Sequence, residues 1–552
     1  APKEKQETMP ASLTKKIAAK CRGLQTHPAT RRFIAHNKKV FGRKQRPTAG
    51  SRPVVLMEFN SMHSAHIAYS YLAKVLASEH GAAIKAYTPR SSSGFAGRAQ
   101  FQLGKIAGHN DFGVYQSFGT EDFIEIYLTS AQKSRALDMQ RQILPRLATK
   151  WDLEALEIEG VWVGDLFYDS YLMDYKRPTI EKDSPEFQAA LLDSIGLFVF
   201  WQEYFDSHDV QAVNASHCVY NLAIPLRIAV WRGIPAYQAN IHHIYRLDSK
   251  NLFAYNDFFN YRKIFSRLPR ELQAAGIETA RERIRRRFTG EVGVDMIYST
   301  KSAYGAAREH RLLRESPRKK ILIATHCFFD SPHSYGNNIF PDFYEWLDFL
   351  GKTSEETDYD WYIKTHPDYL PGTMEIIKTF VARYPKLTLL PSDASHHQII
   401  AEGIDVALTV YGTIAFEYAA LGVPVINASQ NNPHIAYDFN LHAKDAEDYR
   451  RLIHGIQEMN FPIEVSSVYE YYFMKNLFFS WDIFFKSFDS TVSGLGGYNN
   501  LFTALVYDRW LQEWNQDAHE IIMDRLTSFV RSNTFRFAPR ELKYLLPQTN
   551  IQ

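Results

Sequence analysis

The pattern of apolar and polar positions predicts an α/β protein. Residues 53–60 form a short apolar run that ends in polar residues, which is typical of a buried parallel strand. A helical pattern covers residues 67–77, and residues 84–87 resemble the next strand. This succession of strand, loop, helix and strand indicates that a Rossmann-like domain begins here.

The remainder of the first half continues in the same alternating manner. Amphipathic helical stretches fill residues 130–150 and 185–205. Strand-like runs lie at residues 160–165, 210–217 and 233–237, and the first of them ends at an acidic residue. We expect these segments to complete the first parallel sheet and the helices that cover it.

A second α/β unit is predicted beyond a connector that is rich in Arg and Glu. Residues 268–316 carry these charges at helical spacing, so we expect a solvated helical connector. Five apolar runs beyond it predict the strands of a second Rossmann-like sheet. They lie at residues 319–325, 361–364, 387–390, 406–410 and 424–426.

An aromatic segment follows the second unit, at residues 468–488. A helix that is apolar on most of its sides is usually buried between other elements. Contact with a membrane surface is the alternative, although the polar side of this segment lacks Lys and Arg.

These patterns divide the chain into five segments. Its 552 residues exceed what a single hydrophobic core usually serves. We predict a basic N-terminal arm, an N-terminal domain, a helical connector, a C-terminal domain, and a C-terminal helical segment that packs across both domains. Their predicted bounds are residues 1–50, 51–265, 266–317, 318–460 and 461–552.

The composition is that of a globular protein, but its charge is uneven. The net charge is +2, yet residues 1–50 hold 13 Lys and Arg against two Glu, which leaves about −9 for the remainder. An arm this basic suits an anionic membrane surface, and a solvated leader is the alternative. Nucleic acid is disfavoured, because the arm has few aromatic side chains and no recognisable binding module follows it.

The targeting and cysteine patterns favour the cytoplasm. The chain has no run of 18 apolar residues, and no apolar segment typical of a secretory signal follows its basic start. Cys21, Cys218 and Cys327 are widely spaced and odd in number, which fits neither a disulfide framework nor a zinc site. We expect a cytoplasmic protein that contacts the inner face of the cytoplasmic membrane through its arm.

Two short segments of the second half carry the clearest chemistry. Residues 362–367 end a strand with His366, and residues 410–417 run from a strand through Gly412 and Thr413 into a helix. A Gly-Thr turn that opens a helix offers backbone N–H groups and the positive end of the dipole to a phosphate. A His at the end of a neighbouring parallel strand faces the same crevice. The pair predicts a sugar-nucleotide site.

This pair of motifs resembles the capsular polysaccharide and lipopolysaccharide glycosyltransferases of the GT-B type, including those that use CMP-activated Kdo or sialic acid. The resemblance rests on His366, Pro367, Gly412, Thr413 and Glu417. It implies two Rossmann-like domains that face a cleft, with the donor nucleotide on the C-terminal domain and the acceptor on the N-terminal one. It also implies that His-Pro contacts the donor phosphate. This chain has Gly-Thr where sialyltransferase relatives tend to have paired Ser or Thr.

Each of these residues also has a simpler structural interpretation. His366 could be a strand-end His held by a backbone carbonyl, although Lys364 and Pro367 beside it favour ligand binding. Thr413 could cap its helix, since capping and phosphate binding use the same geometry. Glu417 suits a ribose hydroxyl or the helix dipole alone. Lys364 is our candidate for stabilising the departing nucleotide.

The loop that follows the first strand of the second unit is a further candidate. It spans residues 325–336 and contains His326, Asp330 and His333. In the GT-B layout this loop faces the cleft, so we expect it to contact an anion or a sugar, and a turn with satisfied polar groups is the alternative. We expect no metal, because the two His are not spaced as a helical pair and no carboxylate cluster is nearby.

An inverting transfer needs a base that takes the acceptor proton, usually Asp, Glu or His. Asp165 is the first candidate, because it ends a predicted strand after a glycine, where an acid is poorly suited to the core. Asp169 is the second, and His63 follows the first strand on the acceptor face. Helix capping is the competing role for the two Asp residues.

The leading hypothesis is an inverting, metal-independent glycosyltransferase without a bound cofactor. It favours a CMP-ulosonic acid as donor, with UDP or GDP sugars as alternatives, and a bacterial surface glycan, glycolipid or glycoprotein as acceptor. Sugar-nucleotide epimerases and CDP-glycerol-type phosphotransferases share the fold and are alternatives. A non-catalytic, membrane-associated assembly protein is another, against which the joint presence of His366, Thr413 and Glu417 argues.

Overall fold

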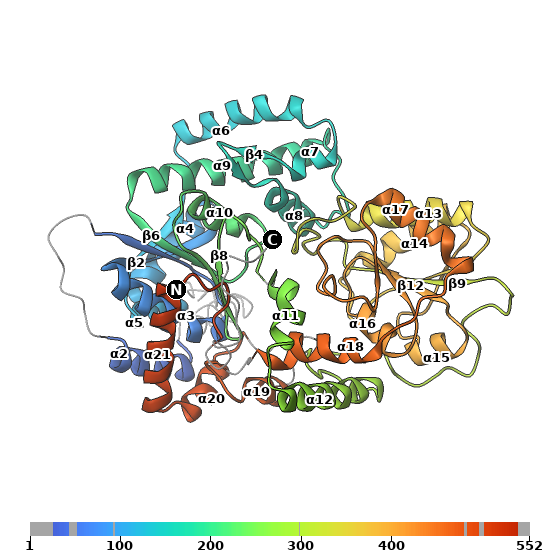
Figure 1. Ribbon diagram of the computed structural model, residues 1–552. Coiled ribbons are helices and arrows are strands. Elements are labelled where there is room, and N and C mark those ends of the chain that lie inside the picture. The colour runs from blue at the N-terminus through green and yellow to red at the C-terminus, as the bar shows by residue number, and fades with distance from the viewer. Residues whose placement is uncertain are drawn as a thin grey trace, which may run out of the picture.

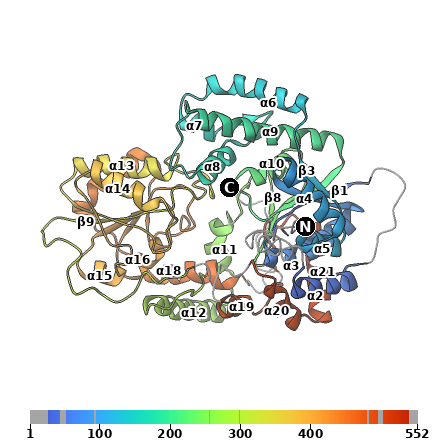
Figure 2. The same ribbon diagram turned by 180° about the vertical axis from the view of Figure 1, so that it is seen from behind.

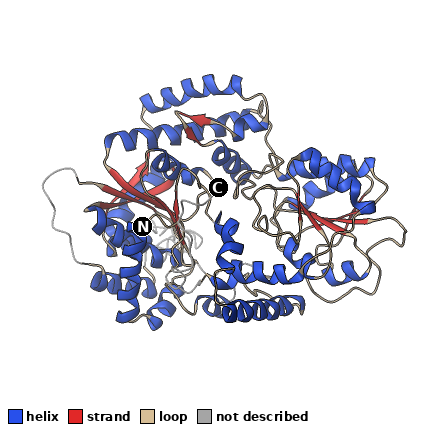
Figure 3. Cartoon of the chain, viewed as in Figure 1, coloured by secondary structure: helices blue, strands red, loops and turns tan. Residues whose placement is uncertain are grey.

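Two α/β units lie side by side in the computed structural model (Figure 1). Figure 3 shows that the strands of each unit lie at its centre with helices packed around them. The structure describes residues 26–42, 52–91, 94–254, 256–296, 299–479, 483–495 and 502–538.

The first unit is built on a six-stranded sheet in the order β3-β2-β1-β6-β7-β8. Every neighbouring pair is parallel except the edge pair β7–β8. All five residues of β1 are buried, as expected for a strand with helices on both faces. The strands are β1 Val54–Glu58, β2 Ala83–Ser91, β3 Thr120–Ile126, β6 Val210–Ala215, β7 Ala236–Ala239 and β8 Ile244–Leu247.

Helices cover this sheet where the periodicity predicts them, including residues 67–77, 130–150 and 185–205. They are α3 His63–His80, α4 Gly94–Ala107, α5 Asn110–Ser117, α6 Ser130–Ile143, α7 Lys150–Glu154, α8 Gly164–Tyr175, α9 Pro185–Ser207 and α10 Ile224–Trp231.

The strand predicted at residues 160–165 is wrong in its extent. Only β5 Val161–Trp162 is extended, and it pairs antiparallel with β4 Glu157–Ile158. Glu159 and Gly160 both have positive φ, as a two-residue hairpin turn of type I′ requires. Helix α8 then begins at Gly164, where a Cβ atom would lie 1.9 Å from the carbonyl oxygen of Leu153. Asp165 therefore lies in the first turn of a helix and not at the end of a strand.

The second unit contains an entirely parallel sheet in the order β11-β10-β9-β12-β13-β14. All five predicted strands are confirmed. The strands are β9 Lys320–Ala324, β10 Asp360–Lys364, β11 Leu387–Leu389, β12 Val406–Thr409, β13 Val425–Asn427 and β14 Leu441–His442. The helices between and after them are α13 Phe343–Glu356, α14 Thr373–Arg383, α15 His396–Ala401, α16 Ile414–Ala420 and α17 Ala446–His454.

The connector is helical over less of its length than its charge pattern predicts. Helix α11 Tyr261–Phe265 is followed by α12 Arg270–Phe288. Gly290 and Gly293 have φ of +89° and +82°, in the left-handed region that ends an α-helix. The described residues between Phe288 and β9 form no helix, and this irregular stretch runs along the second unit.

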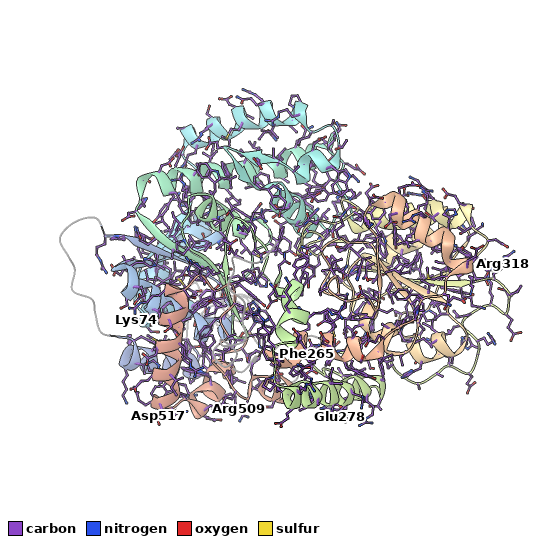
Figure 4. All side chains as sticks on the ribbon, viewed as in Figure 1. Lys74, Phe265, Glu278, Arg318, Arg509 and Asp517 are labelled. Carbon is purple, nitrogen blue, oxygen red and sulfur yellow. The ribbon has the colours of Figure 1, made fainter. Side chains whose placement is uncertain are left out.

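The aromatic C-terminal segment joins the two units. Helix α18 Val465–Tyr472 and the π-helix Phe473–Phe478 pack against α11, α12 and α16. Figure 2 shows α12 and α18 running along one edge of the molecule from one unit to the other. The predicted burial of this segment is confirmed over α18, and in Figure 4 Phe265 lies inside this contact whereas Glu278 of α12 lies on its outer side.

The last helices, α19 Phe488–Gly494, α20 Leu505–Glu513 and α21 Gln516–Arg531, return to the first unit. Part of the predicted basic arm is folded against them. Helix α2 Pro28–Val40 buries Phe33, whose ring stacks on Tyr507 at 4.2 Å, and Arg32 pairs with Asp508. Residues 1–25 and 43–50 of that arm lie outside the described residues. Among the helices that the structure describes, none is long and apolar enough to cross a membrane.

Both sheets have their strands in the Rossmann order 3-2-1-4-5-6, counted along each unit. Loops at the carboxyl ends of the two sheets meet. The Tyr220 hydroxyl, after β6, donates to the Asp330 carboxylate, after β9, at 2.7 Å. Two Rossmann-like units that meet in this way form the GT-B architecture, as the sequence predicts.

Candidate functional site

A cavity of about 260 Å³ lies at the carboxyl end of the second sheet. Its lining comes from the loops after β9, β10 and β12 and from the connector beyond α12. The strand order of the sheet reverses between β9 and β12. Because open α/β sheets bind ligands in the crevice at such a switch point, this cavity is the candidate ligand site.

Most of the predicted ligand residues meet in this cavity. Two do not, because Asp330 and His333 lie at the contact between the units. The predicted residues that line the cavity are His326, Lys364, His366, Pro367, Gly412, Thr413 and Glu417.

Lys364, the last residue of β10, is a buried cation in the cavity lining, with only 2% of its surface exposed. Its ammonium donates to the carbonyls of Thr365 and Ser392, and no carboxylate of the described chain lies within 4.0 Å of it. Burial lowers the pKa of Lys364 to about 8. Burying the ammonium without a nearby carboxylate costs desolvation free energy, and an anionic ligand in the cavity would offset this cost.

Further hydrogen-bond donors surround Lys364. The Nδ1 atom of His366 accepts the Asp368 backbone N–H at 3.0 Å, which leaves Nε2–H of the neutral ring as a donor at the exposed mouth of the cavity. Thr365 and Thr373 line the cavity and are buried, yet neither hydroxyl has a partner among the described residues. Unsatisfied buried polar groups are rare, so these hydroxyls also point to a polar ligand.

His326 is fixed in the wall of the cavity by a network with β12. Its Nε2 accepts the Val410 backbone N–H at 3.2 Å and lies 3.0 Å from the Thr409 hydroxyl, which also accepts the Gly412 backbone N–H. Burial lowers the pKa of His326 to about 3, so the ring is neutral and its proton lies on Nδ1. A Cβ atom on Gly412 would lie 2.8 Å from the Thr409 hydroxyl oxygen, so this network requires a glycine.

Thr413 and Glu417 differ from their simplest predicted roles. Thr413 occupies the N-cap position of α16, but its exposed side chain makes no capping hydrogen bond. Glu417 is 5% exposed and both of its oxygens are engaged. One pairs with Arg287 and the other accepts the Tyr304 hydroxyl at 3.0 Å. Glu417 thus holds the connector, and its oxygens already have partners without a ribose.

The structure places Asp330, His333 and Asp169 in one contact between the units. His333 Nδ1 lies 2.6 Å from an Asp169 oxygen, and both side chains are buried. Burial alone would lower the pKa of His333, but the Asp169 carboxylate raises it to about 9. This pair is a buried ionic contact between α8 and the loop after β9.

Asp165 is also committed to a buried ion pair. Both of its oxygens accept from the Arg227 guanidinium, at 3.1 and 2.5 Å, and both side chains are about 3% exposed or less. The guanidinium also lies over the Trp162 ring at 4.6 Å. Asp165 and Asp169 therefore each hold a buried cation, and neither lies in the cavity.

His63, the third predicted base, lies beside a carboxylate of the first unit. It is half-buried at the start of α3, and its Nε2 lies 3.6 Å from an Asp111 oxygen. Burial alone would raise the pKa of Asp111, but the nearby His63 ring and a hydrogen bond from the Ser61 hydroxyl at 2.8 Å hold it below its usual value. Nδ1 of His63 has no partner among the described residues. Nδ1 is buried, so this His–Asp pair acts as a general base only where an acceptor hydroxyl reaches that atom.

Sequence reasoning missed several residues of these sites, including the Thr373 hydroxyl in the cavity and the Arg227 partner of Asp165. Asp111 lies 48 positions beyond His63, and nothing in the local pattern links the two. Arg287 and Tyr304 were predicted only as parts of a charged connector. Asp368 follows His366-Pro367 directly, so an acid beside that motif was the one available indication. In the part of the chain that the structure describes, no three His, Cys, Asp or Glu residues are grouped to hold a metal ion.

No protein-family model matches this chain, and no curated protein sequence does. Among solved structures, KpsC of Thermosulfurimonas dismutans, a beta Kdo 2,4 transferase, is 11% identical over 49% of this chain and 85% of its own, with a TM-score of 0.28. A glycosyltransferase from Rickettsia africae is 11% identical over 84% of this chain and 100% of its own, with a TM-score of 0.23. The UDP-GlcNAc 2-epimerase of Neisseria meningitidis, bound to UDP-GlcNAc, is 10% identical over 77% and 96%, with a TM-score of 0.21. At these TM-scores the similarities carry no argument about the chemistry of this chain.

Proposed function

We propose that this chain is an inverting glycosyltransferase that uses a nucleotide-activated sugar. The observation that carries the proposal is Lys364, a buried cation without a carboxylate partner within the described chain, at the switch point of a GT-B-type second unit. His366 and the hydroxyls of Thr365 and Thr373 add donors at the same place. These groups suit the phosphate of a nucleotide that carries a sugar.

In the proposed reaction, the bond between the sugar and the donor phosphate breaks as a hydroxyl of the acceptor bonds to the anomeric carbon. Lys364 and the neighbouring donors stabilise the negative charge that develops on the departing nucleotide. His63 takes the proton of the acceptor hydroxyl on Nδ1, while Asp111 stabilises the imidazolium that forms. A base on the first unit and a leaving group held by the second would act on opposite sides of the sugar, and this arrangement would give inversion.

The preferred donor in this proposal is a CMP-ulosonic acid, and no metal ion takes part. The acceptor is a bacterial surface glycan, glycolipid or glycoprotein. We also propose that the basic residues among 1–50 bring the protein to an anionic membrane surface, where such acceptors are assembled.

Thermal unfolding with CMP, CDP, UDP, GDP and inorganic phosphate, each with and without magnesium, tests the donor site. We expect one nucleotide class to raise the melting temperature in a concentration-dependent way. Because Lys364 has a pKa of about 8, this stabilisation should decline as the pH rises through that value and the ammonium loses its proton.

The matched variants are Lys364→Met and Lys319→Met. Lys364→Met should abolish the rise in melting temperature that the nucleotide causes, and with it the decline of this rise at higher pH. Lys319 pairs with Asp405 at the partly exposed start of the same sheet, so Lys319→Met should leave the nucleotide effect unchanged. A wild-type protein that no nucleotide stabilises, or a Lys364→Met variant that binds normally, contradicts the proposed site.

A further inference from the structure

The candidate cavity has two walls of different chemistry. The carboxyl edge of the second sheet carries Lys364, His366 and the two unpartnered Thr hydroxyls. The opposite wall is the connector wall, formed by residues 291–296 and 299–304 beyond α12. Its lining residues are Glu291, Val292, Gly293, Val294, Met296, Ser299, Lys301, Ser302, Ala303 and Tyr304.

Small and apolar side chains predominate on the connector wall, and its two charged lining residues each contact a partner within the protein. Glu291 pairs with Arg286, and the Lys301 ammonium lies 3.5 Å from the carbonyl of Pro367. A mostly apolar wall opposite a cationic one suits a ligand with an anionic end and a flat, less polar end. A nucleotide has this form, with its phosphate at the sheet edge and its base against the connector wall.

Three tethers fix the connector wall to the second unit. Asp368 accepts the backbone N–H groups of Thr300 and Lys301, at 2.9 and 3.3 Å, and the Thr300 hydroxyl at 2.5 Å. The His396 backbone N–H donates to the carbonyl of Ala303 at 3.0 Å. The third tether is Glu417, which holds Arg287 of α12, just before the wall, and Tyr304 at the end of the wall.

The two tethering carboxylates belong to the motifs that follow β10 and β12, so the phosphate wall and the connector wall are joined directly. Asp368 links them most compactly, because its backbone N–H orients His366 while its side chain holds Thr300. A change in the tether therefore alters the width of the cavity without removing any phosphate donor.

We propose that the connector wall selects the nucleobase of the donor, and that Asp368 and Glu417 act as positioning residues that set its distance from the sheet. This inference rests on the proposed function. It separates two properties of one cavity: the sheet edge determines how tightly any phosphate binds, and the connector wall determines which nucleoside is accepted. Selectivity of this kind is a difference between affinities and changes when a wall shifts.

The test compares dissociation constants of the whole chain for CMP, UMP, GMP, AMP and inorganic phosphate. In Asp368→Ala we expect the preference for the best nucleotide over the others to fall by at least about tenfold. Phosphate affinity should change by less than about threefold, because Lys364 and the Thr hydroxyls remain. Asp368→Asn, which keeps one acceptor for Thr300, should restore part of the preference.

Lys364→Met is the matched control, and it should weaken all five ligands together without changing their order. The inference is overturned if Asp368→Ala keeps the wild-type preference among the four nucleotides. It is also overturned if that variant loses affinity for inorganic phosphate as much as for the preferred nucleotide. A wild-type protein that binds all four nucleotides equally overturns it as well and leaves the proposed function standing. If the wild type binds no nucleotide, both proposals fail.

Discussion

Burial decides what a charged side chain does in this protein. Asp165 looked like an acid at a cleft, because it follows a glycine after an apolar run. In the structure it pairs with Arg227, and both side chains are 3% exposed or less. Lys364 is the reverse case, since it is buried without such a carboxylate among the described residues. The first arrangement is structural and the second is suited to a ligand.

At this scale we predict that Asp165→Asn destabilises the protein instead of removing a catalytic base. Loss of one partner leaves the Arg227 charge buried and unpaired, which should lower the free energy of unfolding by roughly 3–5 kcal/mol. Asp138→Asn is the control, because Asp138 pairs with Arg141 on the exposed face of α6 and should cost only about 0–1 kcal/mol. Urea unfolding followed by fluorescence measures both. An Asp165→Asn protein that is as stable as the wild type but inactive would restore the catalytic interpretation.

Close packing between helices holds the connector and the C-terminal segment together. Gly276 of α12 lies against the Phe473 ring of the π-helix, and a Cβ atom there would lie 2.8 Å from three ring atoms. The ring is buried in the cluster that also contains Phe265 and Ala280. Because α12 leads into the connector wall, this contact also determines where that wall begins.

We predict that Gly276→Ala is destabilising although alanine is the better helix former. The gain in helix propensity is at most about 1 kcal/mol, whereas overpacking of the Phe473 ring should cost roughly 1–3 kcal/mol. Gly455→Ala is the control, since no atom lies within 4 Å of the added Cβ and the backbone there is right-handed with φ −79°. Thermal melting should show a lower transition for Gly276→Ala alone. If the two variants have the same melting temperature, the contact between α12 and Phe473 accommodates the added methyl group without loss of stability.

The two units are joined by buried polar contacts as well as by the C-terminal helices. Besides Asp169 and His333, the N-cap residue Asp342 of α13 accepts the hydroxyls of Tyr168 and Thr179 at 2.5 and 2.6 Å. These groups come from the first unit, so one carboxylate caps a helix of the second unit and fastens it to the first. The relative position of the sheet edges, and so of His63 and Lys364, depends on such contacts.

The contact between Asp169 and His333 predicts a pH dependence at the scale of the whole molecule. The pKa of His333 is raised in the folded state, so its contribution is complete below the unfolded value of about 6.5 and is lost as the pH rises through about 9. Hydrogen exchange, corrected for the intrinsic effect of pH, should show less protection of residues 330–336 at pH 10 than at pH 7. In His333→Gln this difference should be absent. His454→Gln changes a partner of the exposed pair with Glu356, and it should show the same pH dependence as the wild type. If protection in the wild type does not depend on pH, the ionic contact between Asp169 and His333 is contradicted.

The fold follows closely from the sequence where periodicity is strong. Five of the six strands of the second sheet and the first strand of the first sheet have continuous apolar runs, and burial on both faces leaves few alternatives for such runs. The predictions that failed concern segments controlled by turn geometry. Glu159 and Gly160 form a hairpin, and Gly290 and Gly293 end the connector helix, because positive φ is set locally and interrupts a pattern that charge spacing alone would extend.

The sequence by itself determined the two Rossmann-like units, the switch-point strands and the motif residues His366, Gly412 and Thr413, since each depends on neighbours a few positions away. Only the tertiary structure decided which charges are paired. Arg227, Asp111 and Arg287 lie 62, 48 and 130 positions from the residues they contact. Contacts over such separations are set by how the units pack, and burial then determines whether a charge is neutralised, as for Asp165, or left for a ligand, as for Lys364.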